Sequence, residues 1–107
     1  MSRDYKVFIQ DILSAIKKID SYSRNISFAK FREDELLIDA IVRNLEIIGE
    51  AAKNIPSSVR DKYEDIEWKK IAGLRDILIH EYFGVDIDIL WDIIKNKLPE
   101  LKKQLNK

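Results

Sequence analysis

The stretch FREDELLIDAIVRNLEIIGEAAKN, residues 31–54, decides the fold, because its apolar residues recur at helical spacing on two separate faces. The first face comprises Ile38, Ile41, Val42, Leu45, Ile48 and Ala52. The second face, nearly opposite, comprises Leu36, Ala40, Ile47 and Ala51. A helix that is apolar on two sides needs two packing partners. A neighbouring helix or a second copy of the chain can supply the second partner, and the small alanines favour the second copy.

Three further stretches have the periodicity of long helices. Residues 4–22 present a single apolar stripe, which predicts an amphipathic helix. Another long helix is expected over residues 66–82. Asp86 is expected to cap the last helix, which Pro99 should bend or restart because proline lacks a backbone N–H.

The connections between these helices are short. Pro56 should end the second helix, since proline disfavours helical geometry in the residue before it. A short helix is expected over residues 58–63, with Ser57 or Ser58 as its cap. The pattern therefore predicts an all-α fold, an up-and-down bundle of four main helices plus one short helix.

The composition indicates a single soluble, helix-rich domain spanning residues 1–107, with 46% hydrophobic and 36% charged residues, three Gly and two Pro. The absence of Cys excludes thiol catalysis, zinc fingers and disulfides. One His is too few for a His-rich metal site, and no cofactor is expected. The apolar runs are too short to span a membrane, and the first residues lack the apolar core of a signal peptide. We therefore expect a cytoplasmic protein.

The formal net charge is zero, but the charges are segregated along the chain. Residues 1–32 carry seven basic and three acidic groups, whereas residues 33–50 carry six acidic groups and one Arg. Residues 95–107 carry five Lys and one Glu. A polyanion would therefore meet the basic ends of the sequence, although a solvated helical surface explains the same pattern.

His80 is the only side chain with an ordinary pKa near neutrality, so it is the one candidate general acid or base. Taken alone, a single His near a helix end more often has a structural or surface role. Asp76 lies four residues earlier, the helical spacing at which its carboxylate can hold the imidazole. Arg75 and Tyr82 are seven residues apart and share an otherwise apolar face, where a guanidinium needs an anion, an opening or a subunit boundary.

The spacing Arg75-x4-His80-x-Tyr82 resembles the motif of the HEPN superfamily, in the form found in HepT-like toxins. The resemblance extends to Ile41–Ala52, Trp68–Arg75 and Tyr82–Asp86, and it covers most of residues 5–105. HepT-like toxins form toxin–antitoxin pairs in which the partner is a minimal nucleotidyltransferase. The chain departs from the family at Asp76, where Asn is frequent, and this carboxylate would weaken the attraction of phosphate.

The resemblance implies a metal-independent endoribonuclease that works as a homodimer with both motifs lining one cleft. His80 would act as general base or acid on RNA, and Arg75 would hold the scissile phosphate. Asp76 would support His80. Tyr82 would accept AMP from the nucleotidyltransferase antitoxin, and the added negative charge would silence the enzyme. The substrate would be RNA, because the attack needs a ribose 2′-hydroxyl.

Two other functions remain open at this stage. In the first, the chain is a non-catalytic helical dimer that binds a nucleotide or the nucleotidyltransferase, and Tyr82 is only a modification acceptor. In the second, the chain is a purely structural bundle in which Arg75 and His80 belong to buried ion pairs. Replacing either residue would then destabilise the fold.

Arg43 lies in a charged strip between the two apolar faces of the second helix, together with Glu46 and Glu50. It either forms an ion-pair network with these glutamates or supports the cleft. A divalent metal on Asp39, Glu46 and Glu50 is disfavoured by Arg43 among them, so no metal site is predicted. Trp68 and Trp91 lie in apolar stripes, which favours core packing over base stacking.

Overall fold

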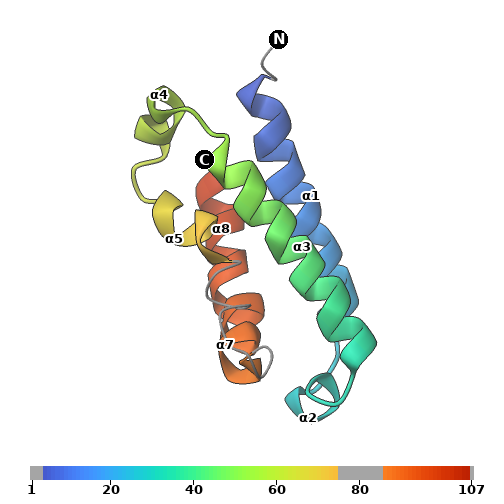
Figure 1. Ribbon diagram of the computed structural model, residues 1–107. Coiled ribbons are helices and arrows are strands. Elements are labelled where there is room, and N and C mark those ends of the chain that lie inside the picture. Colours follow the sequence, from blue (N-terminus) through green and yellow to red (C-terminus); the bar gives the residue numbers. More distant parts are fainter. Residues whose placement is uncertain (1–3, 75–85, 107) are drawn as a thin grey trace.

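The computed structural model describes residues 4–74 and 86–106, and all regular structure in these ranges is helical (Figure 1). The elements are α1 (Tyr5–Ser23), α2 (Phe28–Phe31), α3 (Glu35–Lys53), α4 (Ser57–Arg60), the 3-10 turn η1 (Asp61–Tyr63), α5 (Trp68–Ala72), α7 (Ile87–Asp92), the π-helical turn η2 (Ile93–Lys97) and α8 (Leu98–Leu105). The predicted all-α fold is confirmed. No helix in the described ranges is long and apolar enough to cross a membrane.

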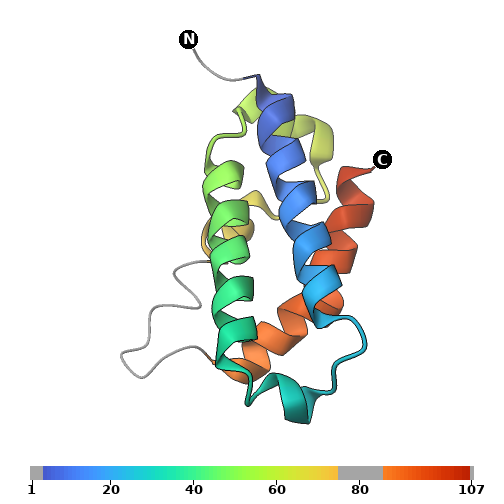
Figure 2. The same cartoon turned by 90° about the vertical axis from the view of Figure 1, so that its right-hand side faces the viewer.

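The core lies between α1, α3 and the C-terminal helices. Helices α1 and α3 run antiparallel side by side, and α8 lies against α1 (Figure 2). The apolar stripe of α1 faces inward, as the periodicity predicts. Side chains that are almost completely buried come from all of these helices: Ile12, Ile16, Ile19, Ile41, Leu45, Ile48, Leu90, Leu98 and Leu101.

The second helix was expected to begin at residue 31, and this boundary is wrong. The chain instead forms the short helix α2, which Ser27 caps by accepting a hydrogen bond from the Lys30 N–H. It then turns, and α3 begins after Asp34, whose Oδ1 accepts a hydrogen bond from the Leu37 N–H at 3.0 Å. The separate α2 places the fully buried Phe31 against the ring of Trp91, a contact that no local pattern reveals.

The cap expected for the short helix is also wrong. Pro56 occupies the N-cap position of α4, and neither Ser57 nor Ser58 caps the helix with its side chain, because both lie within it. A different residue, Arg60, caps the carbonyl groups at the C-terminal end of α3. Its guanidinium donates hydrogen bonds to the carbonyl oxygens of Ile55 and Ala52, at 3.0 and 2.9 Å.

The bend predicted at Pro99 is present as a change of helix type. The Leu98 N–H bonds to the carbonyl of Ile93, five residues earlier, which is the pattern of the π-helical turn η2. Proline lacks an N–H and its ring crowds the carbonyl four residues back, so a widened turn accommodates it. Helix α8 then restarts with Pro99 in its first turn.

Two packing partners of α3 come from the same chain, and the second copy stays a prediction. Helix α1 packs along α3, and α5 packs against another side of it. Ala51, from the second apolar face, is buried in the core of the single chain. Ile47 is partly buried against that core, whereas Leu36 is 82% exposed.

Candidate functional site

The predicted site residues Arg75, Asp76, His80 and Tyr82 lie outside the described residues. The described residues before the motif end at Leu74, and those after it begin at Asp86. The structure therefore defines how the segments on each side of the motif are held.

Before the motif, α5 is held against α3 by a close approach of backbone to backbone. A Cβ placed on Gly49 would lie 3.4 Å from the carbonyl oxygen of Ala72 and 3.5 Å from that of Ile71. Glycine thus leaves room for the end of α5, two residues before Leu74. At the start of α5, the buried Trp68 packs edge-on against the ring of Tyr63, with ring centroids 6.1 Å apart. The helix that leads into the motif is fixed at both ends.

After the motif, the start of α7 is set by Asp86, as predicted. Its Oδ1 accepts a hydrogen bond from the Ile89 N–H at 3.1 Å, which satisfies one of the free donors of the first turn. Trp91 then packs against Phe28 and Phe31, with ring centroids 5.4 and 5.0 Å apart. The prediction that Trp68 and Trp91 serve core packing is confirmed.

A pocket of about 290 Å³ lies between α5 and the α7–α8 arm, beside Leu74. Its apolar walls are Ile71, Leu74, Ile89, Ile93, Leu98 and Leu101. Its described polar lining comprises Asp65, Glu67, Lys70, Asp92, Lys97, Glu100 and Gln104. Four carboxylates against two lysines make this lining unfavourable for phosphate, whereas the apolar walls suit an uncharged group.

Arg43 forms an ion pair with Glu46, with 3.7 Å between Nη1 and Oε2. This pair is part of the ion-pair network predicted for Arg43, but the side chain is 72% exposed and the pair contributes little to stability. The alternative role of Arg43 in supporting the cleft stays a prediction. Arg43 also borders a hollow of about 310 Å³ between α1 and α3, together with Glu46, Glu50 and Asn54. Within residues 4–74 and 86–106, no group of three or more His, Asp or Glu side chains is arranged to hold a metal ion.

Comparison with known proteins identifies the family. The family described as "Ribonuclease HepT-like" matches residues 12–107. The chain belongs to the HepT-like ribonuclease family. This HepT-like chain is 43% identical to "Probable ribonuclease HepT" of Thermococcus cleftensis, over all of this chain and 97% of the relative. It is 47% identical to a "Putative RNase" of Caldanaerobacter subterraneus, over 92% of this chain and 88% of the relative.

A third relative has a different length. The "Gamma-glutamylcyclotransferase and putative RNase" of Methanocaldococcus jannaschii is 42% identical over all of this chain, but the match covers 48% of that protein. The HepT-like chain thus spans about half the length of this relative. No solved structure matches the chain. The resemblance inferred from the motif is confirmed at the level of the family.

The role of Gly49 in positioning α5 is not evident from the local sequence alone. A single glycine inside an otherwise apolar, helical pattern costs helix stability relative to alanine, and this is the signal that points to a packing role. The partner of Gly49 is α5, more than twenty residues further along the chain. Only the tertiary structure identifies that partner.

Proposed function

We propose that this HepT-like chain is a metal-independent endoribonuclease in which Arg75 and His80 are the catalytic residues. The observation that carries the proposal is the Arg-x4-His spacing of these two residues in a chain that belongs to the HepT-like ribonuclease family. Imidazole transfers protons near neutral pH, and guanidinium matches the oxygens of a phosphate. The pair supplies both functions that cleavage of RNA requires without a metal ion.

The reaction begins when His80 removes the proton from a ribose 2′-hydroxyl. The 2′-oxygen attacks the adjacent phosphorus, and the bond from phosphorus to the 5′-oxygen of the next nucleotide breaks. The protonated His80 returns its proton to the leaving 5′-oxygen, so the products are a 2′,3′-cyclic phosphate and a 5′-hydroxyl. Arg75 stabilises the additional negative charge on the phosphate oxygens in the transition state. Asp76 orients the imidazole.

The packing of α5 supports this role for Arg75. Gly49 and Trp68 fix the helix that ends three residues before Arg75. A rigid support keeps a catalytic group in its productive position and avoids an entropic cost during the reaction.

We further propose that the chain works as a homodimer and has a nucleotidyltransferase as its protein partner. Two copies bring two motifs to one cleft, with Arg43 in a supporting role, and the exposed Leu36 supplies an apolar contact for the dimer. Tyr82 accepts AMP from a minimal nucleotidyltransferase antitoxin, and the phosphate of AMP then competes with RNA for Arg75. Intact mass tests this modification, since each AMP adds about 329 Da.

The catalytic proposal is tested with purified, unmodified protein and RNA in the presence of EDTA. We expect cleavage products that end in a 2′,3′-cyclic phosphate, and we expect His80→Ala and Arg75→Ala each to lower the rate by about 100-fold or more. Lys62→Ala, on an exposed residue of η1, is the matched control. Circular dichroism checks that each variant is folded. Equal rates in the parent and both variants would contradict the catalytic assignment.

A further inference from the structure

A groove between α1 and α8 is lined by more basic than acidic side chains among the described residues. The groove has a volume of about 880 Å³, and its floor includes Ile16, Ile94 and Leu98. Four basic residues line it: Lys17, Arg24, Lys102 and Lys103. They come from the two basic ends of the sequence, which the fold brings together because α8 packs against α1.

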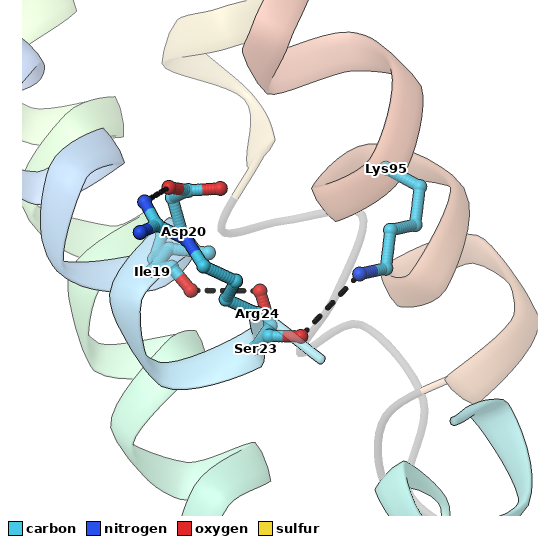
Figure 3. A network of polar contacts seen from close by, with 5 residues as sticks. All are labelled: Ile19, Asp20, Ser23, Arg24 and Lys95. Carbon is cyan, nitrogen blue, oxygen red and sulfur yellow. Dashed lines mark hydrogen bonds and ion pairs between the residues drawn. The ribbon is translucent and has the colours of Figure 1, made fainter. Parts of the chain in front are cut away.

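Asp20 is the one acidic residue in the described lining of the groove, and Arg24 already neutralises it through an ion pair (Figure 3). The pKa of the Asp20 carboxyl is lowered, chiefly by the hydrogen bond from Arg24 and further by the nearby charges of Lys102 and Lys95. Lys17, Lys102 and Lys103 form no ion pair with another described residue. The lining therefore has three positive charges in excess.

Lys95 holds the end of the groove in place. Its Nζ donates a hydrogen bond to the carbonyl oxygen of Ser23 at 3.4 Å (Figure 3). The same Nζ lies 4.6 Å from the ring centroid of Trp91. The Ser23 hydroxyl in turn donates to the carbonyl oxygen of Ile19. The hydrogen bond from Lys95 connects the last turn of α1 to η2, the turn that precedes α8.

We infer that this groove binds the phosphate backbone of the RNA substrate outside the site of cleavage, an inference that rests on the proposed function. Lysine ammonium groups contact phosphates without regard to sequence, and they release the counterions of a polyanion. The described lining contains no aromatic residue on which a base can stack. The groove therefore suits the backbone rather than the bases.

An acidic protein surface is the competing occupant, and the lining disfavours it. Protein–protein interfaces are enriched in aromatic residues and depleted in lysine. The large apolar side chains exposed in the described ranges are Tyr22, Leu36 and Ile89, and none of them lines this groove.

Leu98 lines both this groove and the pocket beside Leu74, so only α8 separates the two. An RNA strand that reaches from the groove to the pocket beside Leu74 would cross one helix diameter, about 10 Å.

The test measures binding of fluorescein-labelled single-stranded RNA by anisotropy, between about 50 and 200 mM salt. The protein carries His80→Ala so that the RNA stays intact. Lys17→Gln, Lys102→Gln and Lys103→Gln are combined in one variant. Lys6→Gln, Lys53→Gln and Lys62→Gln are combined in the control, which removes the same charge from exposed positions that do not line the groove.

We expect the groove variant to bind RNA about tenfold more weakly than the control at the lowest salt concentration. Its salt slope should fall by about 2, because each phosphate contact on a single strand contributes about 0.7. Asp20→Asn should act in the opposite direction. It releases Arg24 from its ion pair, so binding should tighten several-fold and the slope should steepen by about 0.7.

Equal affinity and equal salt slope in the groove variant and the control would overturn the inference. So would a groove variant that binds RNA normally but no longer binds polyglutamate, since this result assigns the groove to an acidic protein. Failure of the proposed function is recognised separately, because it appears as absence of RNA cleavage by the parent chain.

Discussion

Asp20 and Arg24 show how a single ion pair controls the charge of the groove. The pKa of the Asp20 carboxyl lies below its ordinary value of 3.8, mainly because Arg24 donates a hydrogen bond to it. The folded chain thus binds the Asp20 proton less tightly than the unfolded chain does. The stabilisation that this pair provides is present above pH 3.8 and is lost as the pH falls through the lower, folded value. Both side chains are mostly exposed, so the effect on stability is small.

We predict that Arg24→Gln will move the pKa of Asp20 up towards 3.8, because the largest cause of its lowering is removed. Carboxyl NMR during an acid titration measures the change. Glu67 is the internal control, since its pKa is lowered by a hydrogen bond from Lys70 and should stay lowered in this variant. An Asp20 pKa that does not move would show that Lys102 and Lys95 dominate the electrostatics of the groove.

At the scale of the elements, the contact between α3 and α5 positions the segment that enters the motif. The geometry of this contact predicts opposite effects on stability for a small and for a large side chain at position 49. A methyl group there makes an ordinary contact with the Ala72 carbonyl oxygen at 3.4 Å, whereas a larger side chain must displace the backbone of α5. Alanine also favours the helical state over glycine by roughly 0.5–1 kcal/mol.

We therefore predict that Gly49→Ala will keep or raise the melting temperature and retain RNA cleavage. Gly49→Leu should lower the free energy of unfolding by about 1–3 kcal/mol, the usual cost of overpacking. It should also reduce cleavage by more than the loss of folded protein explains, because α5 leads directly to Arg75. Thermal circular dichroism and RNA cleavage at a temperature where both variants are folded measure the two effects. Equal cleavage by both variants would contradict a positioning role for this contact.

At the scale of the whole molecule, the exposed apolar side chains identify where a second copy can dock. Leu36 lies in the first turn of α3 and is 82% exposed, so a polar replacement costs the single chain little. Ala51, which belongs to the same second apolar face, is buried within the chain and cannot contact a second copy directly. Among the residues of the second apolar face, Leu36 is thus the most exposed and the most open to the proposed second copy.

We predict that Leu36→Glu will weaken the proposed homodimer without changing the free energy of unfolding of the monomer. Sedimentation velocity over a range of protein concentrations measures the first effect, and urea unfolding under conditions in which the chain is monomeric measures the second. Glu35→Gln, at the neighbouring exposed position, is the control. A parent chain that is monomeric at every concentration would contradict the dimer itself.

The sequence by itself determined the features that depend on neighbouring residues. The apolar stripe of α1, the cap at Asp86 and the interruption at Pro99 follow from helical periodicity, side-chain capping and the missing N–H of proline. The motif residues Arg75 and His80 were identified differently, through the resemblance of their spacing to a family motif, and their role stays a prediction.

Only the tertiary structure decided the features that join distant segments. Phe31 forms part of a separate α2 because the ring of Trp91, sixty residues later, lies against it. Gly49 receives α5, and α1 packs along α3, so two partners of α3 lie within one chain. Lys17 and Lys102 line one groove because α8 packs against α1. Packing and electrostatic energies depend on distance in space, which the order of residues does not specify until the chain is folded.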